Sequence, residues 1–207
     1  MIPAPMECLR LMDEYRMLPN IRAHSLVVAR VAELLTRALR GGGVLIDVDL
    51  TLAAALMHDI AKSLCLGNGQ DHSRLGEEIC LRHGFHELAP LVAQHVLLDD
   101  DSFPRCPLSA KEIVYYADKR VNHDRIVPLS ARLDYILERY GQDDPARHAA
   151  IMENFERCRA IERAIFQGLD FGPDELPDRL EASPPPGWLP AAGAAGASVT
   201  GEGKLCR

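Results

Sequence analysis

A histidine and an aspartate stand side by side at His58 and Asp59, within the apolar stretch ALMHDIAKS, residues 55–63. Lys62 follows one helical turn after His58. Imidazole and carboxylate side chains can bind divalent cations and can transfer protons. A buried polar pair that only satisfies itself is the alternative, because an unpaired carboxylate is costly to bury. This stretch alone does not separate the two interpretations.

Further histidine and aspartate side chains occur in apolar surroundings elsewhere. His24 lies in IRAHSLVVARVA, His95 in LVAQHVLL and Asp118 in IVYYADKRV. His72 stands at the start of a predicted helix. A metal ion removes the burial penalty by giving each such side chain a partner. Imidazoles and carboxylates that converge from separate helices are a common way to hold a divalent cation in an all-α protein.

Helices must position these residues, because helical periodicity dominates the chain and strand signals are almost absent. Expected N-caps are Asp47 or Asp49 for the third helix and Asp71 for the fourth. The fold class expected is therefore all-α. The predicted helices cover residues 6–18, 20–43, 47–64, 71–84, 86–98, 109–125, 128–141 and 144–169.

Composition limits the class of protein. The chain has 207 residues, 47% of them hydrophobic, which suits one globular domain with a sizeable core. Its net charge of -7 argues against nucleic acid as the main partner, because such binders usually show a basic face. No apolar run is long enough to span a bilayer, so no membrane partner is expected. The six cysteines form no C-x-x-C pair, which favours reduced thiols and a cytoplasmic location.

The composition changes near residue 183. The segment 183–207 is rich in Pro, Gly and Ala, and we expect it to be a disordered tail, with Trp188 as a candidate for docking on the domain. The predicted domain is then residues 1–182.

The order of these residues matches a known pattern. His24, then His58–Asp59, then Asp118 resembles the H…HD…D signature of the HD-domain superfamily of metal-dependent phosphohydrolases. HDIAK resembles the HDIG-type version, in which glycine is usual at the position of Ala61. The resemblance covers about residues 18–140 and implies a compact HD-domain helical bundle.

The resemblance extends to a second metal. HSRLG, residues 72–76, resembles the H-x-x-x-G element of HD proteins that bind two metals, and His95 falls where those proteins place another histidine. The resemblance implies one or two divalent ions, with Mn, Fe, Mg, Zn and Ni all open. Asp59 would bridge the two ions. The implied metal ligands are His24, His58, Asp59, His72, His95 and Asp118.

The implied activity is hydrolysis of a phosphate ester or anhydride of a small molecule, taken to be a nucleotide, by metal-activated water. This makes the chain a candidate phosphomonoesterase or phosphodiesterase. Asp59, Lys62 and Arg125 are the candidate catalytic residues. The two basic side chains would bind phosphate oxygens, Lys62 as a point charge and Arg125 through its planar guanidinium. A surface role for Lys62 and a structural salt bridge for Arg125 remain open.

Two other functions are also compatible with the sequence. A metal-bound HD module could sense or bind a nucleotide without turning it over, and the chain could hydrolyse a dinucleoside tetraphosphate. Small HD hydrolases of diadenosine tetraphosphate often have His-Thr where this chain has His95–Val96, which argues against that substrate. No G-Y-P follows His95, which argues against the branch of cyclic-dinucleotide phosphodiesterases. A helix-start role for His72 and a core role for His95 are the structural alternatives.

Overall fold

The computed structural model describes residues 1–98, 108–141 and 144–189, and in them helices predominate. The prediction of an all-α fold is confirmed. The α-helices are α1 (Pro5–Glu14), α2 (Pro19–Gly41), α3 (Val48–Met57), α4 (His72–Arg82), α5 (Ala89–Ala93), α6 (Ala110–Lys119), α7 (Leu129–Tyr140), α8 (Pro145–Gln167) and α9 (Leu176–Ala182). Two short 3-10 helices, η1 (Lys62–Cys65) and η2 (Pro173–Glu175), and one hairpin of β1 (Val121–Asn122) and β2 (Arg125–Ile126) complete the described elements.

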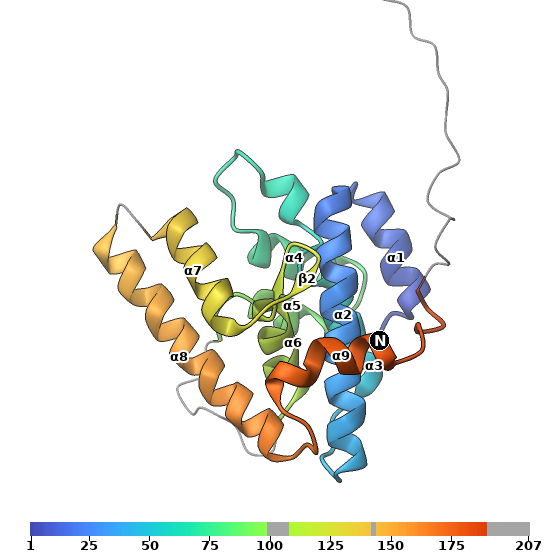
Figure 1. Ribbon diagram of the computed structural model, residues 1–207. Helices are drawn as coiled ribbons and strands as arrows, with labels where there is room; N and C mark the ends of the chain where they lie inside the picture. Colours follow the sequence, from blue (N-terminus) through green and yellow to red (C-terminus); the bar gives the residue numbers. More distant parts are fainter. Residues whose placement is uncertain (99–107, 142–143, 190–207) are drawn as a thin grey trace, which may run out of the picture.

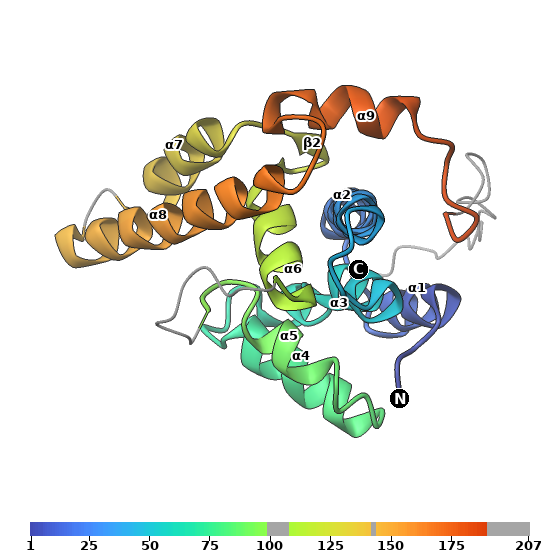
Figure 2. The same ribbon diagram turned by 90° about the horizontal axis from the view of Figure 1, so that it is seen from below.

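The long helix α2 runs through the middle of the molecule and packs against α3 and α6 (Figure 1). On one side, α4 lies beside α5; on another, α7 lies beside α8 (Figure 2). The short helix α9 lies against α2. The hairpin touches α2 and follows directly after α6, so it joins the central helices to α7.

Helix α3 lies at the centre of the core. Its residues Thr51–Met57 are all buried, and the helix contacts α1, α2, α5 and α6. A helix that is apolar all round is expected to be surrounded by other elements. The alanines Ala53, Ala54 and Ala55 let the neighbouring helices come close. The end of α3, where His58 and Asp59 follow, is therefore enclosed by the rest of the fold.

Side-chain caps set the starts of α3 and α4, two of the helices that carry the candidate site. Asp47 accepts a hydrogen bond from the Leu50 amide at 2.9 Å, and Asp71 accepts one from the Ser73 amide at 2.8 Å. Both caps satisfy backbone donors that the first turn of a helix leaves unpaired. The prediction that Asp71 is the N-cap of α4 is confirmed. Of the two N-caps predicted for the third helix, Asp47 and Asp49, the structure has Asp47.

The helix predicted at 6–18 ends at Glu14, and three other predicted helices are also too long. The helix predicted at 47–64 ends at Met57, the one at 86–98 contracts to Ala89–Ala93, and the one at 109–125 ends at Lys119. The chain then turns at His123, whose φ of 55° lies in the left-handed region and cannot continue a right-handed helix. These corrections move His58, Asp59 and His95 out of helix interiors and into the turns that follow helices.

The C-terminal part of the described chain was less well predicted. Helix α9 was not anticipated. Beyond it, the Trp188 indole packs against the core, and its Nε1 donates to Glu33 Oε2 at 2.7 Å. The remainder of the predicted tail, residues 190–207, lies outside the described residues. No helix in the described ranges has the length and apolar character that a membrane span requires.

Candidate metal centre

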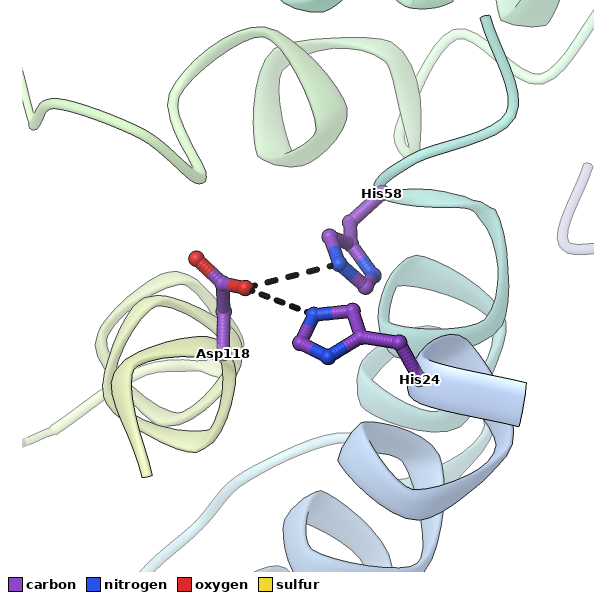
Figure 3. Close-up of side chains that lie close together, drawn as sticks. All are labelled: His24, His58 and Asp118. Atoms are coloured by element: carbon purple, nitrogen blue, oxygen red, sulfur yellow. Dashed lines mark hydrogen bonds and ion pairs between the residues drawn. The ribbon is translucent and has the colours of Figure 1, made fainter. Parts of the chain in front are cut away.

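Six side chains from five helices and their following turns meet in two adjoining groups. The first group is His24, His58 and Asp118, shown in Figure 3, and the second is Asp59, His72 and His95. Within each group the possible ligand atoms all lie within 4.8 Å of one another. The structure therefore brings together all six metal ligands predicted from the sequence.

The first group is centred on Asp118, in the last turn of α6. Its Oδ1 lies 3.0 Å from His24 Nε2 and 3.7 Å from His58 Nε2, the two contacts that Figure 3 marks with dashed lines. His24 comes from α2, and His58 comes from the turn after α3. Three separate elements thus direct one ligand atom each to a common point.

The second group has a similar spacing. Asp59 Oδ1 lies 3.3 Å from His72 Nε2 and 3.4 Å from His95 Nε2, and the two Nε2 atoms are 3.2 Å apart. Two ligands that each bind one cation at about 2.1 Å are expected to lie roughly 3–3.5 Å apart. The spacing of these three side chains therefore suits a shared cation.

Asp59 connects the two groups. While its Oδ1 faces His72 and His95, its Oδ2 lies 3.5 Å from His58 Nε2. The edge-to-face packing of the His58 and His95 rings, with centroids 5.0 Å apart, also joins the groups. A carboxylate that presents one oxygen to each group can bridge two cations.

Backbone carbonyls orient three of the four imidazoles. His24 Nδ1 lies 2.8 Å from the His123 carbonyl, His58 Nδ1 2.8 Å from the Ala55 carbonyl, and His95 Nδ1 2.7 Å from the carbonyl of residue 92. A carbonyl oxygen only accepts, so each Nδ1 must carry the proton that it donates. This leaves Nε2 with its lone pair toward the centre, as metal-binding histidines require.

Two atoms at the centre support a fit to metal ions. His58 Nε2 and Asp59 Oδ1 are buried, yet neither has a hydrogen-bond partner among the described residues. Buried polar atoms are normally paired, because an unpaired one loses its hydration without compensation. A divalent cation in each group would satisfy both atoms, so the residues present fit one or two metal ions.

Charge states at the centre also suit metal binding. Burial alone would raise the pKa of Asp59, but the neighbouring His58 and Lys62 side chains outweigh it and hold that pKa well below the usual range. Lys119 does the same for the pKa of Asp118 against the effect of burial. Burial lowers the pKa of His95 to about 4. Ionised carboxylates and a neutral imidazole are the forms that bind metals.

The two positively charged side chains that were predicted to bind phosphate, Lys62 and Arg125, lie in different settings. Lys62 Nζ is 2.8 Å from Asp59 Oδ2, and its side chain is 38% exposed, so it lies between the buried centre and solvent. Arg125 is exposed in β2, and its side chain makes no hydrogen bond or ion pair with any described residue. Its role in phosphate binding stays a prediction.

Lys119 was not predicted from the sequence to be part of the site. This lysine is buried; its Nζ donates to the His95 carbonyl at 2.6 Å, lies 3.2 Å from Asp118 Oδ2, and sits 4.1 Å from the centre of the Tyr115 ring. It therefore ties a side chain of the first group to the backbone of the second. Its position next to Asp118 in an apolar run was the available signal.

Gly76 explains the H-x-x-x-G pattern in physical terms. A Cβ at this position would lie 2.8 Å from Val92 Cγ1 and 3.6 Å from Ile60 Cγ2. The absence of a side chain lets α4 approach α5 and the turn that carries Asp59. This close approach brings His72, at the start of α4, next to His95, which follows α5.

Comparisons with known proteins agree with this geometry. A family model described as the HD domain matches residues 21–122, a span that contains all six candidate ligands. Ribonuclease Y of Sulfurovum sp. (strain NBC37-1) is 28% identical over 144 residues, 69% of this chain and 26% of that protein. An uncharacterized protein of Methanocaldococcus jannaschii is 28% identical over 149 residues, 66% of this chain and 87% of that protein.

A third relative has two activities in its name. The bifunctional uridylyltransferase/uridylyl-removing enzyme of Aliivibrio fischeri (strain MJ11) is 29% identical over 147 residues, 64% of this chain and 16% of that protein. The chain thus spans about a quarter of the Sulfurovum relative and less of the Aliivibrio one. The chain is therefore similar to one part of each of these two relatives and not to their full length. No solved structure matches the chain.

Proposed function

We propose that this chain, whose residues 21–122 belong to the HD domain family of metal-dependent phosphohydrolases, hydrolyses a phosphate ester or anhydride of a small molecule, a nucleotide. The observation that carries the proposal is Asp59, which presents one carboxylate oxygen to each of two groups of potential metal ligands. A site for two adjacent cations is a recurrent arrangement in enzymes that cleave phosphate esters.

Divalent cations, when bound at such a site, lower the pKa of water and neutralise charge on the attacked phosphate. The protein's own contribution is orientation: the carbonyls that hold His24, His58 and His95 fix the direction of each Nε2. Lys62 adds a positive charge at the partly exposed edge of the site, where a phosphate oxygen would compete with Asp59 for it.

The choice of a nucleotide rests on two kinds of support. The names ribonuclease Y and uridylyl-removing enzyme denote nucleotide chemistry in the relatives. The net charge of -7 disfavours a long polyanion, which favours a small nucleotide over RNA as the substrate. A short RNA is the rival substrate that the relatives suggest.

The test combines metal analysis with a substrate panel. Protein purified without a nickel column is assayed with Mn²⁺ on nucleoside monophosphates, cyclic nucleotides, a dinucleoside tetraphosphate, a short RNA and generic aryl phosphates. We expect turnover of at least one small phosphate ester or anhydride, and we expect Asp59→Ala to lose bound metal and activity together. Full metal content in that variant would contradict the assignment of Asp59.

The panel also separates the alternatives. Tight nucleotide binding without turnover of any compound would support a nucleotide-binding module instead of an enzyme. Turnover confined to the dinucleoside tetraphosphate would support that narrower activity, and turnover confined to RNA would overturn the small-molecule proposal.

A further inference from the structure

We infer that Arg132 binds a phosphate group of the substrate at this centre, together with Lys62. The inference rests on the proposed function for the class of ligand. Arg132 lies in the first turn of α7, outside the residues matched by the HD domain family model, and the sequence-based reasoning assigned it no role.

The hairpin positions Arg132. Its Nη1 donates to Asn122 Oδ1 at 2.9 Å, and its guanidinium carbon lies 5.5 Å from the centre of the Tyr135 ring. The next residue after Asn122 is His123, whose carbonyl holds His24 at 2.8 Å. One short hairpin thus fixes both a candidate metal ligand and this arginine.

Arg132 has an unsatisfied donor. Its Nε is buried and has no hydrogen-bond partner among the described residues, and it forms no ion pair with a described carboxylate. A buried N–H without an acceptor is costly, and the cost is greater when the group is charged. An arginine cannot lose its proton to avoid this cost. An acceptor from outside the described chain would remove it.

Arg120 shows how this fold treats a structural arginine. Its guanidinium donates to the carbonyls of Val127 and Pro173, to the Tyr116 hydroxyl, and to Glu162 at 3.1 Å. Its charge is neutralised, and each guanidinium nitrogen has a partner. Arg132 differs because one nitrogen is buried without a partner and no described carboxylate pairs with it. The difference favours a ligand role for Arg132 over a purely structural one.

Contacts with the candidate metal ligands place Lys62 and Arg132 at the same centre. Lys62 Nζ lies 2.8 Å from Asp59 Oδ2. Arg132 donates to Asn122, and the carbonyl of the next residue, His123, holds the candidate ligand His24.

A phosphate group fits this arrangement of cations. A guanidinium offers parallel N–H donors that match two phosphate oxygens, whereas an ammonium acts as a point charge. Arg132 would then orient the phosphate while Lys62 neutralises it. Because Arg132 and Lys62 lie beside a centre that suits metal ions, the phosphate group that they bind would be the one that is cleaved.

The experiment compares three variants of the full chain, loaded with Mn²⁺: Arg132→Gln, Arg132→Lys and, as the matched control, Arg139→Gln, which changes an exposed arginine on the same helix. The measurements are the Kd for inorganic phosphate by calorimetry, KM and kcat on an aryl phosphate, metal content and unfolding temperature. We expect Arg132→Gln to weaken phosphate binding by about tenfold or more, with Arg132→Lys intermediate. Arg139→Gln should stay within about twofold of the wild type, and metal content should be unchanged in all three.

The outcomes are distinguishable. If Arg132→Gln leaves the phosphate Kd and KM at wild-type values, the inference about Arg132 is wrong, whether or not the unfolding temperature of the variant falls. In that case, turnover of a phosphate ester by the wild type would still support the proposed function. If the wild type turns over no phosphate ester but Arg132→Gln weakens phosphate binding, the proposed function fails and the phosphate site stands. Should Arg132→Gln fail to fold, Arg132→Lys carries the test, because it keeps the charge and loses only the fork.

Discussion

Single residues in this site are recognisable where their chemistry conflicts with their surroundings. His24, His95 and Asp118 stand out in the sequence because an imidazole or a carboxylate interrupts an apolar helical pattern. Arg132 does not stand out in this way, because arginine is common on exposed helix faces, and Lys119 is marked only by its position next to Asp118 in an apolar run. Only the structure shows that Lys119 is buried against Tyr115 and that Arg132 has a buried nitrogen without a partner among the described residues.

His72 gives the most direct test of two separate metal groups. Its side chain is 24% exposed, so truncation disturbs the core little. His72→Ala removes one ligand from the second group and leaves the first intact, so we expect about half of the wild-type metal content. The measurement is metal per chain by mass spectrometry after Mn²⁺ loading and desalting. His83→Ala, at the residue that follows the same helix, is the control, and an unchanged metal content in His72→Ala would argue against two groups.

The cysteines should differ sharply in reactivity. Burial raises the pKa of Cys8, Cys80 and Cys158 to about 12, whereas Cys65 is only partly buried. Because the thiolate is the reactive form, iodoacetamide at pH 8 should modify Cys65 first among these four. Peptide mass spectrometry of a time course measures the order. Urea-unfolded protein should lose the difference, and equal rates in the native protein would contradict the burial of the other three.

At the scale of elements, helical periodicity located the helices better than their ends. Ile60, Ala61 and Leu64 continue the apolar pattern of α3, so nothing in the periodicity marks its end at Met57. The turn is instead defined by tertiary contacts such as those of the buried His58 and Asp59 side chains. The β1–β2 hairpin was missed for a related reason: its positive-φ residue is His123, not a glycine.

Gly76 tests the close contact between α4 and α5. In Gly76→Ala the new methyl group would meet Val92, a stiff β-branched and fully buried side chain. We expect the free energy of unfolding to fall by about 1–2 kcal/mol despite the better helix propensity of alanine. We also expect weaker binding of the second metal, because α4 carries His72. Denaturant unfolding and metal titration measure the two effects.

Gly41→Ala is the matched control for this variant. Gly41 is the last residue of α2, and a Cβ there would have no atom within 4 Å. Its metal affinity should remain at the wild-type value, and its unfolding free energy should stay there or rise slightly, because alanine is the better helix former. Equal behaviour of the two glycine variants would show that the approach of α4 to α5 does not depend on Gly76.

At the scale of the whole molecule, the segment that the family model matches is shorter than the folded core. The match covers residues 21–122, but the described core also includes α8 and α9, which contribute the buried residues Phe155, Ile161 and Leu176. Arg120 links these parts, because it joins α6 to Glu162 of α8 and to the Pro173 carbonyl of η2. The candidate metal centre thus lies in a matched segment whose helix α6 is held in place by later parts of the chain.

The contact between Trp188 and α2 holds the last described residues against the rest of the fold. Trp188 is the single tryptophan of the chain, so its fluorescence reports this contact alone. Its Nε1 donates to Glu33 Oε2 at 2.7 Å, and Glu33 also pairs with Arg37. In Glu33→Ala we expect a red-shifted emission and a loss of about 1–2 kcal/mol of unfolding free energy, because a hydrogen bond to a charged acceptor is removed.

The matched variant Glu33→Gln separates the hydrogen bond from the charge. Its amide oxygen can still accept from Trp188, whereas the ion pair with Arg37 is lost, and that pair is worth little because the arginine side chain is 63% exposed. Emission in Glu33→Gln should therefore stay close to the wild type, and its denaturant midpoint should lie between those of the wild type and Glu33→Ala. If Glu33→Ala has the emission of the wild type, Trp188 does not depend on Glu33, and residues 183–189 are held against α2 by apolar packing alone.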